Sequence, residues 1–385
     1  MTLPRIDVDQ RRARLGTRHL LALSTRVETV EEVADALVAV HATDPATVFL
    51  SIASRLRTPA HEPVERALYD DVTLHRLLAM RRTMFVVPAD LAPLVQGSTG
   101  VTIAARERAK LLTYLSDGAG WDARRLAEVQ QAVLDALRTR GEATAVQLGQ
   151  DVPALCEQVV VAPGKPYETK QNVSSRIIRI LACDGLIRRA RPRGSWISSQ
   201  FRWSLASPWP PMPIADAQAE LARRWLAVYG PATAADLKWW TGWSLGATRK
   251  ALAGMDEVEL DEGTGYVVPG DAEPVVEPEP WVALLPGLDS TTMGWRDRDW
   301  YLSPAHVPQL FDTMGNAGPT VWCDGRVVGA WTQRADGEIV WRLLEDIGAD
   351  AEAAVAREAA TMASWLGAVR VQPRFPAPLE RELSR

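Results

Sequence analysis

The sequence predicts an α+β protein made of three successive units of helices and strands, followed by a small β-rich domain. Three observations predict this fold class. A chain of 385 residues is long for one hydrophobic core, which favours two to four domains. An order of helices and then strands recurs along the chain. Proline-rich linkers at residues 207–213 and 271–280 separate segments of different composition.

The composition is that of an ordinary globular protein, with 47% hydrophobic and 24% charged residues. The first residues, MTLPRIDVDQRRARLG, lack an apolar stretch, and no run of about 18 apolar residues occurs, so neither a signal peptide nor a membrane span is expected. A cytoplasmic protein is therefore expected. Three cysteines without a CxxC pair, and the isolated His19 and His306, favour neither a metal site nor a disulfide framework. No Walker A sequence is present, so an ATP-driven mechanism is not expected, and no cofactor is implied.

The first unit is expected over residues 1–118. Helices are expected at residues 8–20, 28–40, 45–56 and 64–80, and a strand ended by Pro88 is expected at residues 81–88. Asp44 precedes Pro45 and is expected to cap the third helix, so His41 should lie on a short link between two helices. His75 is interpreted as a core histidine on a helix face. This order of elements is typical of a winged-helix unit.

The second unit, residues 119–206, has the same order. Helices are expected at residues 126–141, 144–152 and 172–185, and two strands are expected in residues 186–207 around a Pro-Arg-Gly turn. Thr144 and Asn172 are expected N-caps, whereas Gly141 and Gly185 are expected to end helices. We interpret this unit as a helix-turn-helix followed by a β-wing.

The third unit, residues 214–270, fits a winged helix as well. Helices are expected at residues 217–230, 233–242 and 244–255, and a hairpin is expected at residues 258–270 with Gly-Thr-Gly as its turn. Its wing, DEVELDEGTGY, is acidic and would repel DNA. A structural role is therefore expected, with Trp239, Trp240 and Trp243 packing into an interdomain surface.

The last segment, residues 280–385, is expected to form a small barrel-like β domain with one helix. Strands are expected at residues 281–289, 319–333, 338–345 and 369–373, and the helix at residues 351–367.

Residues 172–205 hold the clearest cationic cluster of the chain, with seven arginines and one acid, Asp184. On a recognition helix and a wing, guanidinium groups can contact DNA phosphates or enter the minor groove. The residues expected to bind DNA here are Arg176, Arg179, Arg188, Arg189, Arg191 and Arg193. The alternative is a solvated basic face. The net charge of −5 argues against DNA binding by the surface as a whole.

A second charged segment, LLPGLDSTTMGWRDRDWYL, combines Asp289, Asp297 and Asp299 with Arg296 and Arg298. One interpretation is a turn held by ion pairs, which contribute little energetically. The other is a loop that reaches into a bound duplex, with Arg296 and Arg298 as DNA contacts.

Together with this order of units, the stretches HATDPATVFLSIASRL, RRTMFVVPADL and LLPGLDSTTMGWRDRDWYL resemble the winged-helix DNA glycosylases of the AlkZ and YcaQ type. The resemblance spans nearly the whole chain. It implies hydrolysis of the N-glycosidic bond of bulky N7-alkylated purines in double-stranded DNA, unhooking of interstrand crosslinks, or self-resistance to alkylating antibiotics. The signature of these proteins is Gln-x-Gln or Gln-x-Asp followed by Asp-Pro. Here the same place has His41-Ala42-Thr43-Asp44-Pro45.

The resemblance implies that His41, Thr43 and Asp44 act on the glycosidic bond. An N7-alkylated purine is cationic and leaves without a proton, so the enzyme has only to place a water and stabilise positive charge on the sugar. A neutral imidazole, with an ordinary pKa of about 6.5, can accept the proton of that water while Thr43 orients it and Asp44 supplies negative charge. The structural alternative is that His41 satisfies a helix end and Asp44 caps the next helix.

Two other functions stay open from the sequence: a winged-helix protein that binds DNA without hydrolysis, and a transcription regulator. Most helix-turn-helix regulators read two half-sites as dimers, whereas this chain has one clear basic reader and no obvious dimerisation helix. A monomer is therefore expected.

Overall fold

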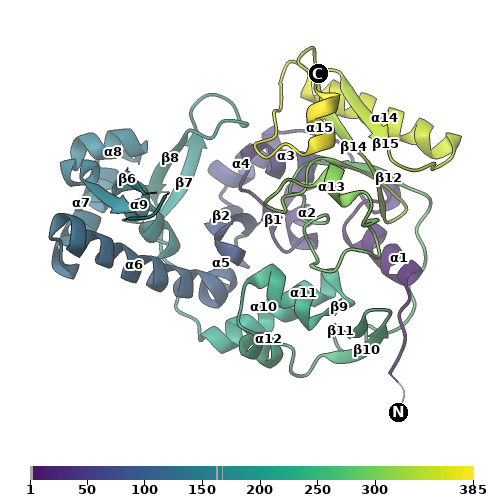
Figure 1. Ribbon diagram of the computed structural model, residues 1–385, viewed down its shortest axis with the longest axis horizontal. Helices are drawn as coiled ribbons and strands as arrows, with labels where there is room; N and C mark the ends of the chain where they lie inside the picture. The colour runs from purple at the N-terminus through teal and green to yellow at the C-terminus, as the bar shows by residue number, and fades with distance from the viewer. Residues whose placement is uncertain (1–2, 162–163, 167) are drawn as a thin grey trace.

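The computed structural model describes residues 3–161, 164–166 and 168–385. The expected α+β class is confirmed, because helices and antiparallel sheets alternate along the chain. Figure 1 shows one lobe, drawn in blue and teal, that stands apart from the rest of the molecule. This lobe contains α7, α8, α9, β7 and β8, and it is called the basic lobe below. No helix among the described residues is long and apolar enough to cross a membrane.

The N-terminal region combines helices with a three-stranded antiparallel sheet in the order β1-β3-β2. Its elements are α1 (Val8–Arg18), α2 (Val30–Ala36), β1 (Val40–His41), α3 (Pro45–Ala53), α4 (Glu62–Tyr69), β2 (Leu74–Leu78) and β3 (Met84–Pro88), with short 3-10 turns at Leu23–Thr25 and Met80–Arg82. The chain then continues through α5 (Ala92–Val95), a π-helical turn (Gln96–Gly100) and α6 (Val101–Ala119).

Two predictions for this region were wrong. The helix expected at residues 64–80 ends at Tyr69, and the second half of that segment is β2, which pairs with β3. The break falls at two aspartates followed by Val72, which adopts a positive φ of 56°, and β-branched residues there favour a strand. His41 does not follow a helix end, since it lies in β1 opposite Phe85 of β3.

The basic lobe is built around its own apolar core, in which Val133, Leu137, Ile177 and Ile180 are fully buried. Its elements are α7 (Ala123–Arg140), β4 (Glu142–Ala143), α8 (Ala145–Asp151), a 3-10 turn (Pro153–Cys156), β5 (Gln158–Val161), β6 (Thr169–Asn172), α9 (Ser174–Cys183), β7 (Ile187–Pro192) and β8 (Phe201–Leu205). The strands form a sheet of order β4-β8-β7 and a separate β5-β6 hairpin.

The caps of the basic lobe agree with the sequence at three positions and differ at one. Thr144 forms a capping box with Gln147, and Gly141 and Gly185 follow their helices with φ of 75° and 74°. Asn172 is not an N-cap, because it belongs to β6, and the β5-β6 hairpin was not predicted at all. Val173 therefore occupies the N-cap of α9 without a side-chain hydrogen bond.

The tip of the β7-β8 hairpin is not a free wing. Trp196 is only 3% exposed and packs against Phe49 of α3, with ring centroids 4.7 Å apart. Its ring centroid also lies 5.7 Å from that of His61, and it stacks on Trp365 of α14 (Ala349–Leu366) with centroids 6.2 Å apart. The hairpin tip therefore bridges the basic lobe to the main body of the molecule.

The third helical region shares one large apolar core with α1 and the C-terminal domain. Its elements are α10 (Ile214–Tyr229), β9 (Ala232–Thr233), α11 (Ala234–Thr241), α12 (Leu245–Ala251), β10 (Asp256–Leu260) and β11 (Gly263–Val267), with the sheet order β10-β11-β9. The predicted burial of its tryptophans is confirmed: Trp240 and Trp243 lie in this core, and Trp239 packs on its edge.

The acidic hairpin of this region contacts the N-terminal segment. Leu260 pairs with Gly263, so the turn is Asp261-Glu262 and not the expected Gly-Thr-Gly. These two carboxylates accept hydrogen bonds from Arg5 at 2.9 Å and from Arg11 at 2.5 Å. The acidic wing therefore has cationic partners within the chain, which fits its expected structural role.

The C-terminal domain is an open sheet and not the expected barrel. Its strands β12 (Val282–Leu285), β13 (Thr320–Cys323), β14 (Arg326–Gln333) and β15 (Ile339–Leu343) lie in this order, all antiparallel. Over the described part of the chain, β12 and β15 do not pair to close the sheet. The helices are α13 (Val307–Leu310), α14 and α15 (Pro378–Leu383).

The strand expected at residues 369–373 does not form. The side chain of Gln333, at the end of β14, accepts the backbone N–H of Val371 at 2.8 Å and donates to the carbonyl of Val369 at 3.1 Å. A side chain thus takes the hydrogen bonds that a ladder partner would have made.

Candidate functional site

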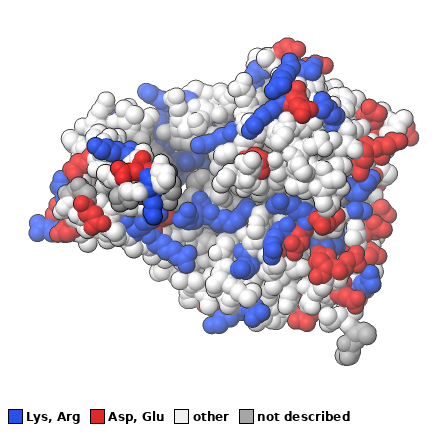
Figure 2. All heavy atoms as spheres, viewed as in Figure 1, with Lys and Arg blue, Asp and Glu red and all other residues white. Residues whose placement is uncertain are grey.

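The candidate site is a cleft of about 440 Å³ between the N-terminal sheet and the basic lobe. Strands β2 and β3 supply one wall, and α9 and β7 supply the other. Its polar and charged lining residues are Thr43, Arg76, Arg82, Thr83, Glu107, Ser175, Arg179, Arg188 and Arg189. We call it the interlobe cleft. Figure 2 shows Lys and Arg atoms gathered along this hollow, whereas many Asp and Glu atoms lie on the far right edge.

His41 is held in place by its backbone and is almost fully buried. It is 4% exposed, and its N–H donates to the Ser290 hydroxyl at 3.1 Å. Its ring meets Phe85 edge-on with centroids 4.9 Å apart, and among the described residues its Nδ1 has no hydrogen-bond partner. Burial, together with the charge of Arg81, lowers the pKa of His41 to about 3. The imidazole is therefore neutral at physiological pH, but it is a much weaker base than the sequence suggested.

Thr43 lies in the wall of the interlobe cleft, with its hydroxyl buried. Its side chain lines the cleft, and its hydroxyl has no hydrogen-bond partner within residues 3–161, 164–166 and 168–385. A buried hydroxyl without a partner costs free energy, so this atom is suited to hold a water or a substrate atom.

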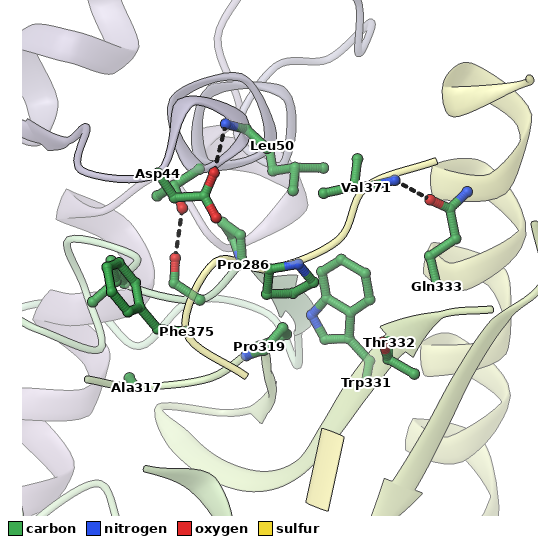
Figure 3. A pocket seen from close by; sticks show the side chains of 15 residues that line it. Asp44, Leu50, Pro286, Ala317, Pro319, Trp331, Thr332, Gln333, Val371 and Phe375 are labelled. Atoms are coloured by element: carbon green, nitrogen blue, oxygen red, sulfur yellow. Dashed lines mark hydrogen bonds between the residues drawn. The ribbon is translucent and has the colours of Figure 1, made fainter. Parts of the chain in front are cut away.

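Asp44 is a structural cap with both carboxylate oxygens engaged. Oδ1 accepts the N–H of Ala46 at 3.1 Å, which caps α3, and Oδ2 accepts the N–H of Arg374 at 2.9 Å. Figure 3 shows Asp44 beside a small cavity that Pro286, Trp331 and other residues line. That cavity has about 20 Å³, room for about one water and not for a nucleotide. Asp44 is not part of the lining of the interlobe cleft.

The segment after β12 holds the backbone near the His41-Thr43 stretch through hydrogen bonds of Ser290. Ser290 accepts from His41 and donates to the carbonyl of Ala39 at 2.8 Å. Next to it, Asp289 and Arg55, which follows the C-cap of α3, form an ion pair at 2.8 Å with both side chains 0% exposed. Burial raises the pKa of Asp289, but the charge and hydrogen bonds of Arg55 outweigh this and hold the pKa below its ordinary value.

The charged segment 284–302 therefore neither forms a turn of local ion pairs nor reaches into the cleft. Asp289 pairs with Arg55 just after α3, and the Arg296–Asp297 contact is weak at 3.9 Å on exposed side chains. Arg298 lies on Trp239 and Phe311, and neither it nor Arg296 lines the interlobe cleft.

The structure divides the six predicted DNA-binding arginines of the basic lobe into three groups. Arg179, Arg188 and Arg189 line the interlobe cleft. Arg176 lies over Tyr114, and Arg193 is exposed near the hairpin tip. Arg191 is already paired, since it donates to Glu65 at 2.8 Å and to both oxygens of Asp70. Arg191 is therefore already paired with carboxylates of the chain, unlike its neighbours Arg188 and Arg189.

Sequence reasoning missed Arg76 and Tyr69. Both came from the segment interpreted as one long helix, so neither was placed near the cleft. The signal that would have found Arg76 is the β-branched pair that follows two aspartates after α4.

Among the residues that the structure describes, no group of three or more His, Cys, Asp and Glu side chains is placed to hold a metal ion.

Comparisons with known proteins show which family the chain belongs to. The chain is similar to the Streptomyces sahachiroi DNA glycosylase AlkZ in structure, with a TM-score of 0.73 and 22% sequence identity, over 96% of this chain and 99% of that chain. No curated protein matches the sequence. Residues 34–365 match the family described as DNA glycosylase AlkZ-like. Since this match covers most of the 385 residues, the chain belongs to the AlkZ-like family of DNA glycosylases.

Proposed function

We propose that this protein hydrolyses the N-glycosidic bond of a bulky N7-alkylated purine in double-stranded DNA, for repair or for self-resistance to an alkylating antibiotic. The family supports the class of reaction. The observation that carries the proposal is the hydroxyl of Thr43, which is buried without a partner among the described residues, in a residue that lines a cleft rich in arginines. The Thr43 hydroxyl can hydrogen-bond the attacking water, and the arginines can bind the phosphates of the DNA strand.

The reaction requires few catalytic groups from the protein. A cationic purine leaves with the bonding electron pair and needs no general acid, and the sugar passes through an oxocarbenium-like state that a water then attacks. Thr43 orients this water from the cleft wall. His41, neutral and fixed by Ser290, accepts a hydrogen bond from the water and does not have to remove its proton before the bond breaks. Asp44 positions the stretch as a helix cap.

Duplex binding is assigned to the basic lobe. We propose that residues 119–206 act as the reading winged-helix unit, between winged-helix units at residues 1–118 and 214–270, with the C-terminal domain at residues 280–385. Arg188 and Arg189 line the interlobe cleft, so a strand that enters the cleft meets both cations, and we assign the exposed Arg193 to the flanking duplex. One chain supplies both the reader and Thr43, so a monomer suffices.

The test is the release of free base from duplexes that carry a small or a bulky N7-alkylguanine adduct. We expect the wild type to release at least one adduct. His41→Ala should lose about 100-fold or more in rate while its duplex affinity stays within about threefold. The matched control is His306→Ala, a histidine at the start of α13 far along the chain from the motif, which should act like the wild type. Binding without release of any adduct by the wild type would contradict the proposal.

A second candidate is a protein that binds DNA without hydrolysis. It is favoured by one observation: the low pKa of His41 and the occupied oxygens of Asp44 leave the motif without a strong base. Under this alternative, His41→Ala changes neither duplex affinity nor any release of base.

A further inference from the structure

A second polar site lies next to the interlobe cleft, around a group of donors that lack acceptors. Arg76 of β2 is 7% exposed, and within the described residues its Nε, Nη1 and Nη2 all lack hydrogen-bond partners. The hydroxyl of Tyr69 and the Nε of Arg189 are likewise buried without partners there. A buried guanidinium with no acceptor is costly, because both its N–H groups and its charge are left uncompensated.

The residues that carry these buried donors lie in one part of the molecule. A cavity of about 420 Å³ is lined by Tyr69, Arg76, Arg188 and Arg189, among others. The same three arginines also line the interlobe cleft, so their side chains stand between the two spaces. The volume is that of a small-molecule site and exceeds the volume of one water many times.

The structure holds the arginines close together despite their charge. Arg76 and Arg189 both lie on the ring of Phe201, with guanidinium carbons 4.8 and 4.6 Å from its centroid. Burial and then the charge of Arg76 lower the pKa of Arg189 to about 9. Like charges that are brought together in this way destabilise the protein unless an anion binds between them.

The chain itself does not supply that anion. Among the described residues, no carboxylate lies within 4.0 Å of the cationic nitrogens of Arg76, Arg188 or Arg189. Asp44 favours the charged form of Arg76 through space, but both of its oxygens are bonded to backbone N–H groups. Glu107 on the cleft wall is shared by Arg82 at 3.4 Å and Arg179 at 3.7 Å. Water can accept the hydrogen bonds but leaves the charge uncompensated.

We infer that Arg76, Arg189 and Tyr69 form a binding site for a tetrahedral phosphate oxyanion. A phosphate offers several acceptor oxygens and a negative charge, and arginine recognises it through paired N–H groups. The same chemistry is found in a phosphodiester of the DNA backbone and in free phosphate. Assignment to the backbone rests on the proposed function, whereas the site itself does not.

The first arm of the test titrates the full-length protein with inorganic phosphate in calorimetry, with KCl adjusted to constant ionic strength. We expect saturable binding by the wild type. Arg76→Met should weaken it about tenfold or more, and Tyr69→Phe, which removes only the hydroxyl, should weaken it about threefold or more. The matched control is Arg66→Met, an exposed arginine of α4 whose contact with Asp71 is 3.5 Å, and it should bind like the wild type.

Absence of saturable phosphate binding by the wild type would overturn the site, and so would equal binding by wild type and Tyr69→Phe. Tyr69→Phe keeps the ring and its packing, so this variant decides the question even if Arg76→Met fails to fold.

The second arm identifies the source of the phosphate group. If the site holds the DNA backbone, phosphate displaces an undamaged duplex more strongly than KCl of equal ionic strength, and this difference disappears in Tyr69→Phe. Equal displacement by both salts assigns the site to free phosphate. If the wild type binds phosphate but releases no base, the proposed function fails and the site stands; if it releases base without binding phosphate, the reverse holds.

Discussion

At the scale of single residues, three neighbours in one motif have different surroundings. Thr43 faces the cleft, His41 is buried and neutral, and Asp44 is turned toward the C-terminal domain, where it caps α3 and accepts from Arg374. A carboxylate that already accepts two backbone N–H groups is a structural element first. Its charge is therefore not needed to explain the chemistry.

Substitution of Asp44 separates its structural role from a catalytic one. Asp44→Ala should lower the free energy of unfolding by about 1–2 kcal/mol, because the cap and the bond to Arg374 are both lost. Asp44→Asn keeps the capping oxygen and should lose less stability, which urea unfolding measures. Base release by Asp44→Asn should stay within about threefold of the wild type. A loss of about 100-fold in a folded Asp44→Asn protein would instead show that the negative charge acts on the sugar.

The buried histidines predict how stability depends on pH. The folded-state pKa values of His19 and His41 are lowered to about 3, mainly by burial, so the unfolded chain binds more protons below pH about 6.5. Stability should therefore fall as pH decreases through the range from 6.5 to 5, by up to about 1.4 kcal/mol per pH unit for each histidine. Unfolding by urea at several pH values measures this slope. His41→Gln, which cannot titrate, should have a shallower slope, and an unchanged slope would show that His41 is not buried as a neutral ring.

At the scale of elements, the β7-β8 hairpin serves two purposes along its length. Its first strand carries Arg188 and Arg189 into the cleft wall, while its tip places Trp196 against α3 and α14. Arg191 lies between them and is tied to α4 through Glu65 and Asp70. The hairpin therefore both presents cations and fixes the basic lobe to the body.

The difference between the arginines in the cleft wall and the paired Arg191 predicts which of them affect the salt dependence of duplex binding. Arg189→Ala and Arg193→Ala should each weaken binding and reduce the slope of log K against log salt by about 0.9, the value for one lost phosphate contact. Arg191→Ala is the matched control and should leave the slope unchanged, because Arg191 is already neutralised within the chain. A titration of fluorescent duplex at several KCl concentrations measures the slopes. Unchanged slopes in both Arg189→Ala and Arg193→Ala would exclude the basic lobe as the reader.

At the scale of the whole molecule, residues far apart in sequence meet below the motif. Arg55 and Asp289 join the end of the α3 region to the segment after β12, and this same segment holds the backbone of His41 through Ser290. The C-terminal domain therefore takes part in the site although it does not line the cleft.

Removal of one partner of this pair should destabilise the molecule strongly. Arg55→Met leaves Asp289 buried and unpaired, which should cost about 3–5 kcal/mol in the first urea transition. The exposed Arg57, whose contact with Glu28 is 3.6 Å, supplies the control Arg57→Met, which should cost less than about 1 kcal/mol. Equal stability of the two variants would show that the buried pair does not hold the domains together.

Local features of this fold were predictable from the sequence, and features that depend on distant partners were not. The caps at Asp44 and Thr144 involve only neighbouring residues, and both formed as expected. Strand β2 was interpreted as helix, because its apolar spacing also suits a helix and only the pairing with β3 decides between them. Arg76 was missed for the same reason.

The electrostatics of the motif also depend on distant residues. The second partner of Asp44, Arg374, is 330 residues away. The low pKa of His41 comes from burial by elements that the sequence does not place together. The motif was therefore found from the sequence, but the separate roles of its members required the fold.

The most direct test of the central claim compares two threonines of the interlobe cleft. Thr43 has a hydroxyl without a partner among the described residues, whereas the hydroxyl of Thr83 donates to the carbonyl of Met80 at 3.0 Å. Single-turnover release of an N7-alkylguanine base from duplex DNA should fall about 100-fold or more in Thr43→Val and stay within about threefold in Thr83→Val, with duplex affinity unchanged in both. Release by Thr43→Val at the wild-type rate would contradict the account.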